Sequence, residues 1–515
     1  MKNFLGIDVG TSGTKALVCR EDGLVLGVGV ANHPISHPQP GWSEQNPEDW
    51  WTSSVQAVQQ AVRQAQVPSH TLGGIGLSGQ MHGSVFLDRH RKVLRPALLW
   101  NDQRTVNECT EIEELAGGRA ALIQMVSNPA FTGFTAPKIL WLKKHEPQVY
   151  QNLDSVMLPK DYLRYRLTGD DATDVSDASG TLLLDVKLRR WHTALLQKLQ
   201  LSQDVLPPCF ESTELTGQLS AAAAKELGLP AGLPVAAGGG DQAAGAVGSG
   251  IVQTGLVSAV LGTSGVVFAH APRPDTHPKG QVHTMCHAVR NAWHMMGVVL
   301  SAGGSLQWFR NQFCQEEVHQ AKVQNKDPYE LIIEAVQPIA PGAEGLFFLP
   351  YLTGERHPYA DPFARGAWLG LSVRHSRWHL ARAVIEGITF ALKDCLCVME
   401  GLGIQFKQIR LAGGGSRSAF WRQLQADIFG HPVALVNSTE GAALGAAIIA
   451  MVGTRVYNDI PEACRCILQV VETMDPNPKR HARYAELHAE YQRLYPLLQS
   501  AFPRWVNSAV ADALP

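Results

Sequence analysis

The sequence has few charges, no paired cysteines and no long hydrophobic run, and each of these absences excludes a class of protein. Charged residues make up 17% of the 515 residues and the formal net charge is -2, without a lysine or arginine run, which argues against nucleic-acid binding. The nine cysteines are odd in number and never form a Cys-x-x-Cys pair, which favours reduced thiols in the cytoplasm. The longest apolar run, residues 442–452, is well short of a membrane span of about 20 residues, and the chain begins without a basic and apolar leader. We therefore expect a protein that is neither exported nor embedded in a membrane.

The sequence also has no Gly-x-x-x-x-Gly-Lys-Ser/Thr motif, so nucleotide phosphates would need another kind of loop. Residues 7–15 offer one, because an apolar run meets an alternating run through a turn of small residues, a pattern that predicts a β-hairpin. Asp8 adds a carboxylate where a divalent cation would sit. A plain hairpin turn is the alternative explanation of this single copy. The turn supplies glycines, hydroxyl groups and a cation that suit an anion: Gly10, Thr11, Ser12, Gly13 and Lys15.

A second copy of this pattern favours the phosphate-binding interpretation. Residues 257–268 repeat the order of strand, Gly262-Thr263-Ser264-Gly265 and strand. Two matching loops in one long chain indicate an internal duplication in which a nucleotide's phosphate tail is held between the halves. Because 515 residues are too many for one core, we expect two large α/β domains, residues 1–247 and 248–515.

Two further predicted strands end in polar side chains that suit a ligand. Residues 72–79 lead into Gln80 and His82, and their formal Gly-x-Gly-x-x-Gly pattern is not a dinucleotide fingerprint because no helix follows it. A purely structural role is the alternative for His82. Residues 98–100 lead into Asn101 and Asp102, which suit hydroxyl groups of a ligand, with an ordinary polar loop as the alternative.

Two glycine-rich segments also follow predicted strands. The strand at 233–237 is followed by three glycines, Asp241, and small residues that begin a helix. The glycines allow close backbone approach to a ligand, and Asp241 is a candidate general base, with a helix N-cap as the alternative. Near residue 411 another strand leads into glycines 413–415 and then a helix, an arrangement typical of sites for the adenosine or phosphates of a nucleotide.

Two helices have clear sequence signals. The first is predicted to begin after an N-cap at Asn46 with Pro47 in its first position. Its predicted buried face is Trp51, Val55, Val58 and Val62. The chain is predicted to end in an amphipathic helix whose stripe is Tyr484, Leu487, Tyr491, Leu494 and Leu498.

On these motifs, the chain resembles the FGGY family of carbohydrate kinases. That family has duplicated actin- and hexokinase-like ATPase domains of the ribonuclease H-like type, with a central cleft between them. Two long family signatures are matched by residues 133–145 and 366–386. Within the family, residues 78–83, 95–102, 158–164 and 238–248 are most similar to members that phosphorylate D-xylulose. Met81-His82 stands where glycerol kinases of the family have Arg-Glu.

The resemblance implies transfer of a phosphoryl group from ATP, with Mg²⁺, to the terminal hydroxyl group of D-xylulose. Asp241 would be the general base, and Asp8 would hold Mg²⁺ through water. The residues implied for the sugar are Gln80, Met81, His82, Asn101, Asp102, Asp241 and Gln242. The residues implied for ATP are Gly10, Thr11, Ser12, Thr14, Lys15, Gly262, Thr263, Ser264, Gly303, Gly414, Gly415 and Ser418.

Other functions remain open on the sequence alone. A kinase for another ketose or polyol, such as ribulose or xylitol, would share every motif above. A sugar-responsive or nucleotide-responsive sensor on the same fold is the alternative from another class, although a sensor could have lost Asp241. In either case the expected partners are a small sugar and ATP, without nucleic acid or membrane, and a homodimer is a further expectation. Closure of the cleft over both substrates is expected to exclude water from the reaction.

Overall fold

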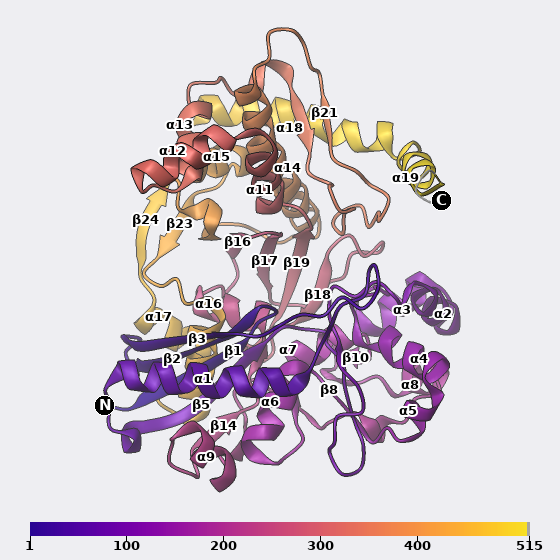
Figure 1. Cartoon of the computed structure of the whole chain (residues 1–515), viewed down its shortest axis with the longest axis vertical. Helices are drawn as coiled ribbons and strands as arrows, with labels where there is room; N and C mark the ends of the chain where they lie inside the picture. Colours follow the sequence, from indigo (N-terminus) through magenta and orange to yellow (C-terminus); the bar gives the residue numbers. More distant parts are fainter. Residues whose placement is uncertain (512–515) are drawn as a thin grey trace. The chain divides into compact units, whose positions relative to one another are not determined.

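The computed structural model describes residues 1–511, which form two compact α/β units (Figure 1). Each unit is built from separated stretches of the chain. Unit 1 contains residues 1–253, 270–294 and 438–469, and unit 2 contains residues 254–269, 295–437 and the chain from 470 onward. Unit 1 therefore also contains three stretches of the predicted second domain, residues 248–253, 270–294 and 438–469.

The main sheet of unit 1 has the strand order β13-β14-β5-β1-β2-β3, with the short strand β15 also paired to β5. The antiparallel pair β1 and β2 places Asp8 opposite Lys15, and the parallel pair β1 and β5 places Asp8 beside Ser78. The predicted first hairpin is confirmed, and β3 pairs antiparallel with its second strand. These strands are β1 Asn3–Val9, β2 Gly13–Arg20, β3 Val25–Asn32, β5 Leu72–Gly79, β13 Leu215–Gln218, β14 Pro234–Ala236 and β15 Gly239–Gly240.

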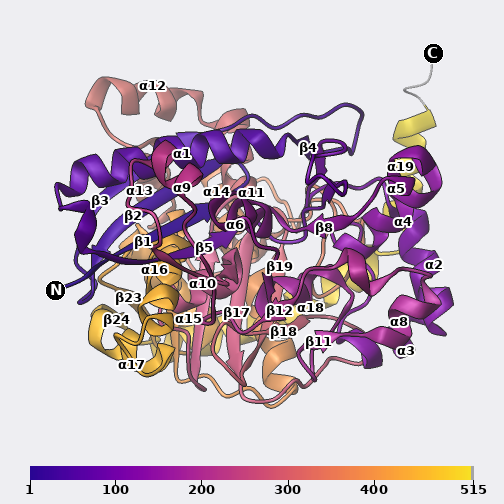
Figure 2. The same ribbon diagram turned by 90° about the horizontal axis from the view of Figure 1, so that it is seen from below.

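Helices cover both faces of this sheet (Figure 2). Helix α1 (Pro47–Ala65) lies along one face, and α10 (Asp241–Gly248) and α16 (Gly441–Gly453) lie on the other. The approach of α16 to β5 is so close that a Cβ atom on Gly76 would lie 1.7 Å from the carbonyl oxygen of Ala446. Only glycine is compatible with this contact at that position.

Helix α1 begins as predicted, since the side chain of Asn46 accepts a hydrogen bond from the backbone N–H of Glu48. The predicted buried face is partly wrong, because Val55 and Val62 are only half-buried. Two glycines on β3 let the helix backbone come within contact of the strand, which turns the small side chains of the helix inward. The buried side chains are Trp50, Trp51, Ser53, Ser54, Ala57, Val58 and Ala61.

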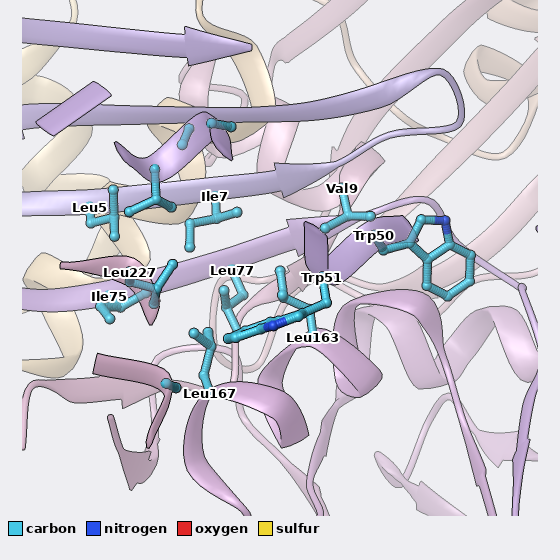
Figure 3. Packing of buried hydrophobic residues seen from close by; sticks show 14 of the residues in the cluster. Leu5, Ile7, Val9, Trp50, Trp51, Ile75, Leu77, Leu163, Leu167 and Leu227 are labelled. Carbon is cyan, nitrogen blue, oxygen red and sulfur yellow. The ribbon is translucent and has the colours of Figure 1, made fainter. Parts of the chain in front are cut away.

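The core beneath this sheet lies between the strands and helices α1, α6 (Pro159–Thr168) and α9 (Ala221–Leu227). Figure 3 shows the side chains of β1 and β5 pointing toward those of the helices. This packing fixes the carboxyl ends of β1 and β5, where the candidate site residues follow. The labelled residues are Leu5, Ile7, Val9, Trp50, Trp51, Ile75, Leu77, Leu163, Leu167 and Leu227, all buried.

The rest of unit 1 consists of short strands and helices, many of them around a second core that includes Phe134, Leu142 and Leu195. Its strands are β4 Glu44–Gln45, β6 Val85–Leu87, β7 Ala97–Leu98, β8 Ser155–Met157, β9 Thr173–Asp174, β10 Leu184–Asp185, β11 Arg190–Trp191, β12 Cys209–Phe210 and β18 His283–Cys286. Its further helices are α2 Val106–Ala116, α3 Arg119–Val126, α4 Thr135–His145, α5 Pro147–Gln151, α7 Val175–Ala178, α8 Thr193–Lys198 and α17 Ile460–Ile467.

In unit 2, the sheet follows the order β19-β17-β16-β22-β23-β24. The antiparallel pair β16 and β17 confirms the second predicted hairpin, and β16 runs parallel to β22. The strands of this unit are β16 Leu256–Leu261, β17 Gly265–Ala271, β19 Trp293–Val299, β20 Phe347–Leu349, β21 Ala367–Leu369, β22 Gln408–Gly413, β23 Val433–Val436 and β24 Val470–Met474. Its helices are α11 Gly303–Phe313, α12 Gln315–Gln324, α13 Pro328–Val336, α14 Arg377–Gly401, α15 Ala419–Phe429, α18 Pro478–Leu498 and α19 Phe502–Ala511.

The predicted C-terminal amphipathic helix is α18, but it is not the end of the chain, because α19 follows it. Tyr484, Leu487 and Tyr491 are buried as predicted, whereas Tyr495 takes the place expected for Leu494. The helices among residues 1–511 include none with the combined length and apolar character needed to cross a bilayer. The nine cysteines are all free thiols, as the sequence predicted.

Candidate active site

The tip of the first hairpin is held by a network of side chains that surround Gly10 and Thr11. The backbone N–H of Gly10 donates to the Gly13 carbonyl at 3.0 Å and closes the turn. His33 lies 3.0 Å from the Gly10 carbonyl through Nε2, and Gln45 donates to the Thr11 carbonyl at 2.7 Å. These contacts keep the turn rigid before any ligand binds.

Two hydroxyl groups predicted to face a ligand already form hydrogen bonds with other side chains of the protein. The Thr11 hydroxyl donates to Gln80 Oε1 at 3.1 Å and accepts from the indole N–H of Trp100 at 2.9 Å. The Thr14 hydroxyl is buried and lies 2.9 Å from the Ser53 hydroxyl. Neither side chain is therefore free to donate to a phosphate group, and what this turn offers an anion is its backbone and the exposed Ser12.

Asp8 stands at the end of β1, partly buried, with Lys15 opposite it on β2. Burial raises the pKa of Asp8, although the Ser78 hydroxyl and the charge of Lys15 act to lower it. Its Oδ1 atom is buried without a partner of normal hydrogen-bond geometry within the described chain. Lys15 is itself paired with Glu440 at 3.0 Å. A buried carboxylate oxygen left in this way fits a hydrated divalent cation.

Asp241 is the first residue of α10, and Gly240 is its N-cap, so the alternative interpretation of Asp241 as an N-cap is wrong. Gly239 pairs with Ser78 on β5, and Ser78 pairs with Asp8 on β1, so both aspartates lie at the same end of the sheet. Burial, together with the charge of Asp8, raises the pKa of Asp241 to about 7. Gln242 donates to Asp241 Oδ1 at 3.3 Å. A carboxyl group poised near neutral pH suits a general base.

Met81 and His82 follow β5 and are both buried. The Nδ1 atom of His82 lies 2.7 Å from the Gly180 carbonyl, which requires the proton on Nδ1. Its ring packs on Phe134 at 4.7 Å between centroids. A Cβ atom on Gly180 would lie 2.5 Å from the His82 ring, so the position of His82 depends on this glycine.

Other predicted sugar residues have structural contacts that occupy them. Gln80 is buried and bonds to Thr11 and to Gln45 at 2.9 Å, which ties the hairpin tip to the rest of unit 1. The Asp102 carboxylate accepts from the backbone of Ser43 at 2.7 Å and from the Arg104 guanidinium at 2.8 Å. Its polar atoms are therefore satisfied locally, whereas Asn101 keeps a buried Oδ1 without a hydrogen-bond partner in the described residues.

Unit 2 contains a pocket of about 810 Å³ at the tip of the second hairpin. The Gly262 N–H closes this turn by donating to the Ser264 carbonyl at 3.0 Å, whereas in the first hairpin the Gly10 N–H donates to the Gly13 carbonyl. The start of α11 joins it, since the Gly303 N–H donates to the Gly262 carbonyl at 3.0 Å. A pocket of this size suits a nucleotide. Six predicted ATP residues line it: Gly262, Thr263, Gly303, Gly414, Gly415 and Ser418.

Sequence reasoning missed several residues of these sites. Helix α13 contributes Tyr329 and Ile333 to the pocket wall, Gln337 follows the end of this helix, and Phe420 lines the pocket from α15. The amphipathic pattern of α13 was a signal for a helix but not for a ligand. Gln45 and Trp100 also had no local signal, because only the folded chain brings them to the hairpin tip.

Comparison with known proteins agrees with this arrangement. Residues 3–248 match the model of the N-terminal domain, and residues 257–454 that of the C-terminal domain, of the FGGY family of carbohydrate kinases. The chain therefore belongs to the FGGY family of carbohydrate kinases, and the predicted two-domain actin- and hexokinase-like fold is confirmed.

Particular relatives are similar over nearly the whole chain. The xylulose kinase of Escherichia coli is 40% identical over 96% of this chain and 98% of its own length. The xylulose kinase of Bacillus subtilis is 37% identical over 96% of this chain and 97% of its own length. A solved structure from Brucella ovis, described as a xyloylose kinase, is 37% identical with a TM-score of 0.87, and the match covers 97% of this chain and 100% of that one.

Proposed function

We propose that this protein catalyses the ATP-dependent phosphorylation of D-xylulose to D-xylulose 5-phosphate. The observation that carries the proposal is the poised carboxyl group of Asp241 beside the buried Met81-His82 pair, in a chain similar from end to end to xylulose kinases. Unit 1 supplies the sugar site and the base, and unit 2 supplies the nucleotide pocket.

In the proposed reaction Asp241 accepts the proton of the sugar's terminal hydroxyl group. The hydroxyl oxygen forms a bond to the γ-phosphorus of ATP while the bond from that phosphorus to the bridging oxygen breaks, which leaves ADP. Because the transition state of phosphoryl transfer is loose, much of the proton transfer comes late. Asp241 therefore also orients the attacking oxygen, and the hydrogen bond from Gln242 holds its carboxylate in place.

Asp8 is the residue that would hold Mg²⁺, through water, by its buried Oδ1 atom. When bound, the ion would neutralise charge on the transferred phosphoryl group. The described residues contain no cluster of three or more histidine, cysteine, aspartate or glutamate side chains able to bind a metal, which fits a cation bound mainly by phosphates and water.

The phosphate groups of ATP are proposed to be bound by the turns of the two hairpins. In unit 1 the donors are the backbone of residues 10–13, the Ser12 hydroxyl and the charge of Lys15. In unit 2 they are the backbone of Gly262 to Ser264 and the start of α11, with the adenosine against α13 and α15. The domain division at residue 247, a cytoplasmic location and a homodimer also remain proposals. The mass of the purified protein in solution tests the last.

The test is ADP release from Mg-ATP with a panel of D-xylulose, L-xylulose, D-ribulose, L-ribulose, glycerol, gluconate and xylitol. We expect the highest kcat/KM with D-xylulose. A preference for another sugar would support kinase activity but show that the substrate is a different ketose or polyol. Absence of turnover with every sugar, in a folded protein that binds ATP, would instead support a sensor.

A further inference from the structure

Asp177 belongs to a buried group of side chains next to the sugar site in which the charges do not balance. Lys160 of α6 lies 2.6 Å from Asp161, 3.2 Å from Asp174 and 4.0 Å from Asp177. All four side chains are at most 1% exposed. One cation cannot compensate three carboxylates without water, so at least one of the acids carries a proton.

The three acids differ in the hydrogen bonds that they accept. Asp174 accepts from the backbone and the hydroxyl of Ser176 and from the Ser212 hydroxyl, at 2.5 to 2.8 Å. Asp161 has the shortest contact with Lys160 and lies at the start of α6. Asp177 accepts no hydrogen bond from the described residues and has only the longer contact with Lys160. Burial, with the negative charges of Asp161, Asp174 and Asp241 and against the charge of Lys160, raises its pKa well above the ordinary value.

Both carboxyl oxygens of Asp177 are buried without a hydrogen-bond partner within residues 1–511. A protonated carboxyl group has one donor and at least one acceptor, and leaving such atoms without a hydrogen bond in the interior is destabilising. Native proteins seldom leave groups in this state unless a ligand or water completes them.

The neighbours of Asp177 in the chain contact residues at the proposed sugar site. The residue before it, Ser176, accepts a hydrogen bond through its hydroxyl from the backbone N–H of Gly240, directly before the base Asp241. Three residues after it, the Gly180 carbonyl accepts the hydrogen bond of His82. The segment is thus fixed at one end to the base and at the other to the predicted sugar residue, and the charge of Asp241 acts on Asp177.

We propose that Asp177 is a sugar-binding residue whose protonated carboxyl group donates a hydrogen bond to an oxygen atom of the ketose substrate. A neutral acid contributes a donor without adding a second negative charge beside Asp241, which must itself ionise to act as a base. The inference rests on the proposed sugar kinase activity and adds a residue that selects the sugar.

The test compares three variants of the full-length protein. Asp177→Asn keeps the size, neutrality, donor and acceptor, whereas Asp177→Leu keeps only the approximate size. Asp161→Asn is the matched control, because it removes a carboxylate from the same buried group. For each we would measure kcat, the KM values for D-xylulose and ATP, and the melting temperature.

We expect Asp177→Leu to raise the KM for D-xylulose about tenfold, the loss of roughly one hydrogen bond, with the KM for ATP unchanged. For Asp177→Asn, the KM for D-xylulose and the KM for ATP should both stay within about threefold of the wild-type values. Asp161→Asn should lower the melting temperature and leave the KM for the sugar within about threefold. An unchanged sugar KM in Asp177→Leu, or an equal rise in Asp177→Asn or Asp161→Asn, would overturn the proposal.

A second measurement does not depend on the folding of Asp177→Leu. In the wild type at about pH 8, where most of Asp241 is ionised, the infrared C=O band of a protonated carboxyl group should shift when D-xylulose is added. The shifting band should be missing from Asp177→Asn. A sugar-bound wild type without such a shift would overturn the proposal. Failure of the kinase function itself would look different, because the wild type would not turn over D-xylulose at all.

Discussion

Replacing Asp241 by asparagine tests the proposed chemistry most directly. Asparagine has nearly the same size and can keep the contact with Gln242, but it cannot accept the hydroxyl proton. General base catalysis usually contributes about 10²- to 10⁴-fold, so we expect kcat to fall by about that factor while D-xylulose still binds. ADP release measures kcat, and calorimetric titration with the sugar measures binding.

The pH dependence of the wild type gives the same base a second signature. The pKa of Asp241 is raised to about 7, and the base works only when ionised, so activity is present above this pH and is lost as the pH falls through it. About a tenth of the molecules have the ionised base at pH 6 and about nine-tenths at pH 8, so kcat/KM should rise about ninefold between them.

The control is Asp22→Asn, which removes an exposed carboxylate that is paired with Arg20 and is not among the proposed site residues, and it should behave as the wild type. Turnover of Asp241→Asn within tenfold of the wild type would refute the role of Asp241 as base. A flat kcat/KM from pH 6 to pH 8 would refute its raised pKa in the free enzyme.

Three other predictions concern the glycines and the buried histidines. Gly180→Ala should raise the KM for D-xylulose by about tenfold, because its Cβ atom would lie 2.5 Å from the His82 ring, and an unchanged KM would show that His82 does not position the sugar. Gly303→Ala should raise the KM for ATP by a similar factor, since its Cβ atom would lie 2.3 Å from the Gly262 carbonyl oxygen, and normal ATP kinetics would contradict the proposed nucleotide site. Burial lowers the pKa of His270 to about 4 and of His294 to about 3, so both bind protons on unfolding below about pH 6.5. Through these two histidines the free energy of unfolding in urea should therefore fall by about 3 kcal/mol between pH 6.5 and pH 5, and equal stability at the two pH values would contradict the neutral state of these side chains.

The two hairpins and the glycine loops could be predicted because their signals are local. A strand followed by small residues and a second strand can form only a few structures, and the duplication of Gly-Thr-Ser-Gly was visible in the letters alone. Asp241 stood out for the same reason, since an acidic residue directly after three glycines has few ordinary explanations. The family resemblance then extended these local patterns to the whole fold.

The state of each side chain was not predictable, because it depends on partners far away in the chain. Thr11 was expected to donate to phosphate, but Trp100 and Gln80 occupy its hydroxyl group. Asp102 was expected to contact the sugar, but Arg104 and Ser43 use its oxygens. Helix α1 turned its small residues inward because glycines on a neighbouring strand allowed close contact.

The sequence by itself thus determined the class of fold, the two hairpin turns proposed to bind phosphate and the candidate base, since these follow from short-range rules of backbone and chemistry. Only the tertiary structure decided which polar groups are free to act. A hydrogen bond within the protein occupies a donor or acceptor, and burial raises the free energy of a charged side chain. Both effects depend on which distant segments of the chain come into contact. The clearest case is Asp177, which has no distinctive signal in the sequence. In the folded chain its carboxyl group is buried near Lys160, is affected by the charge of Asp241, and has no hydrogen-bond partner among the described residues.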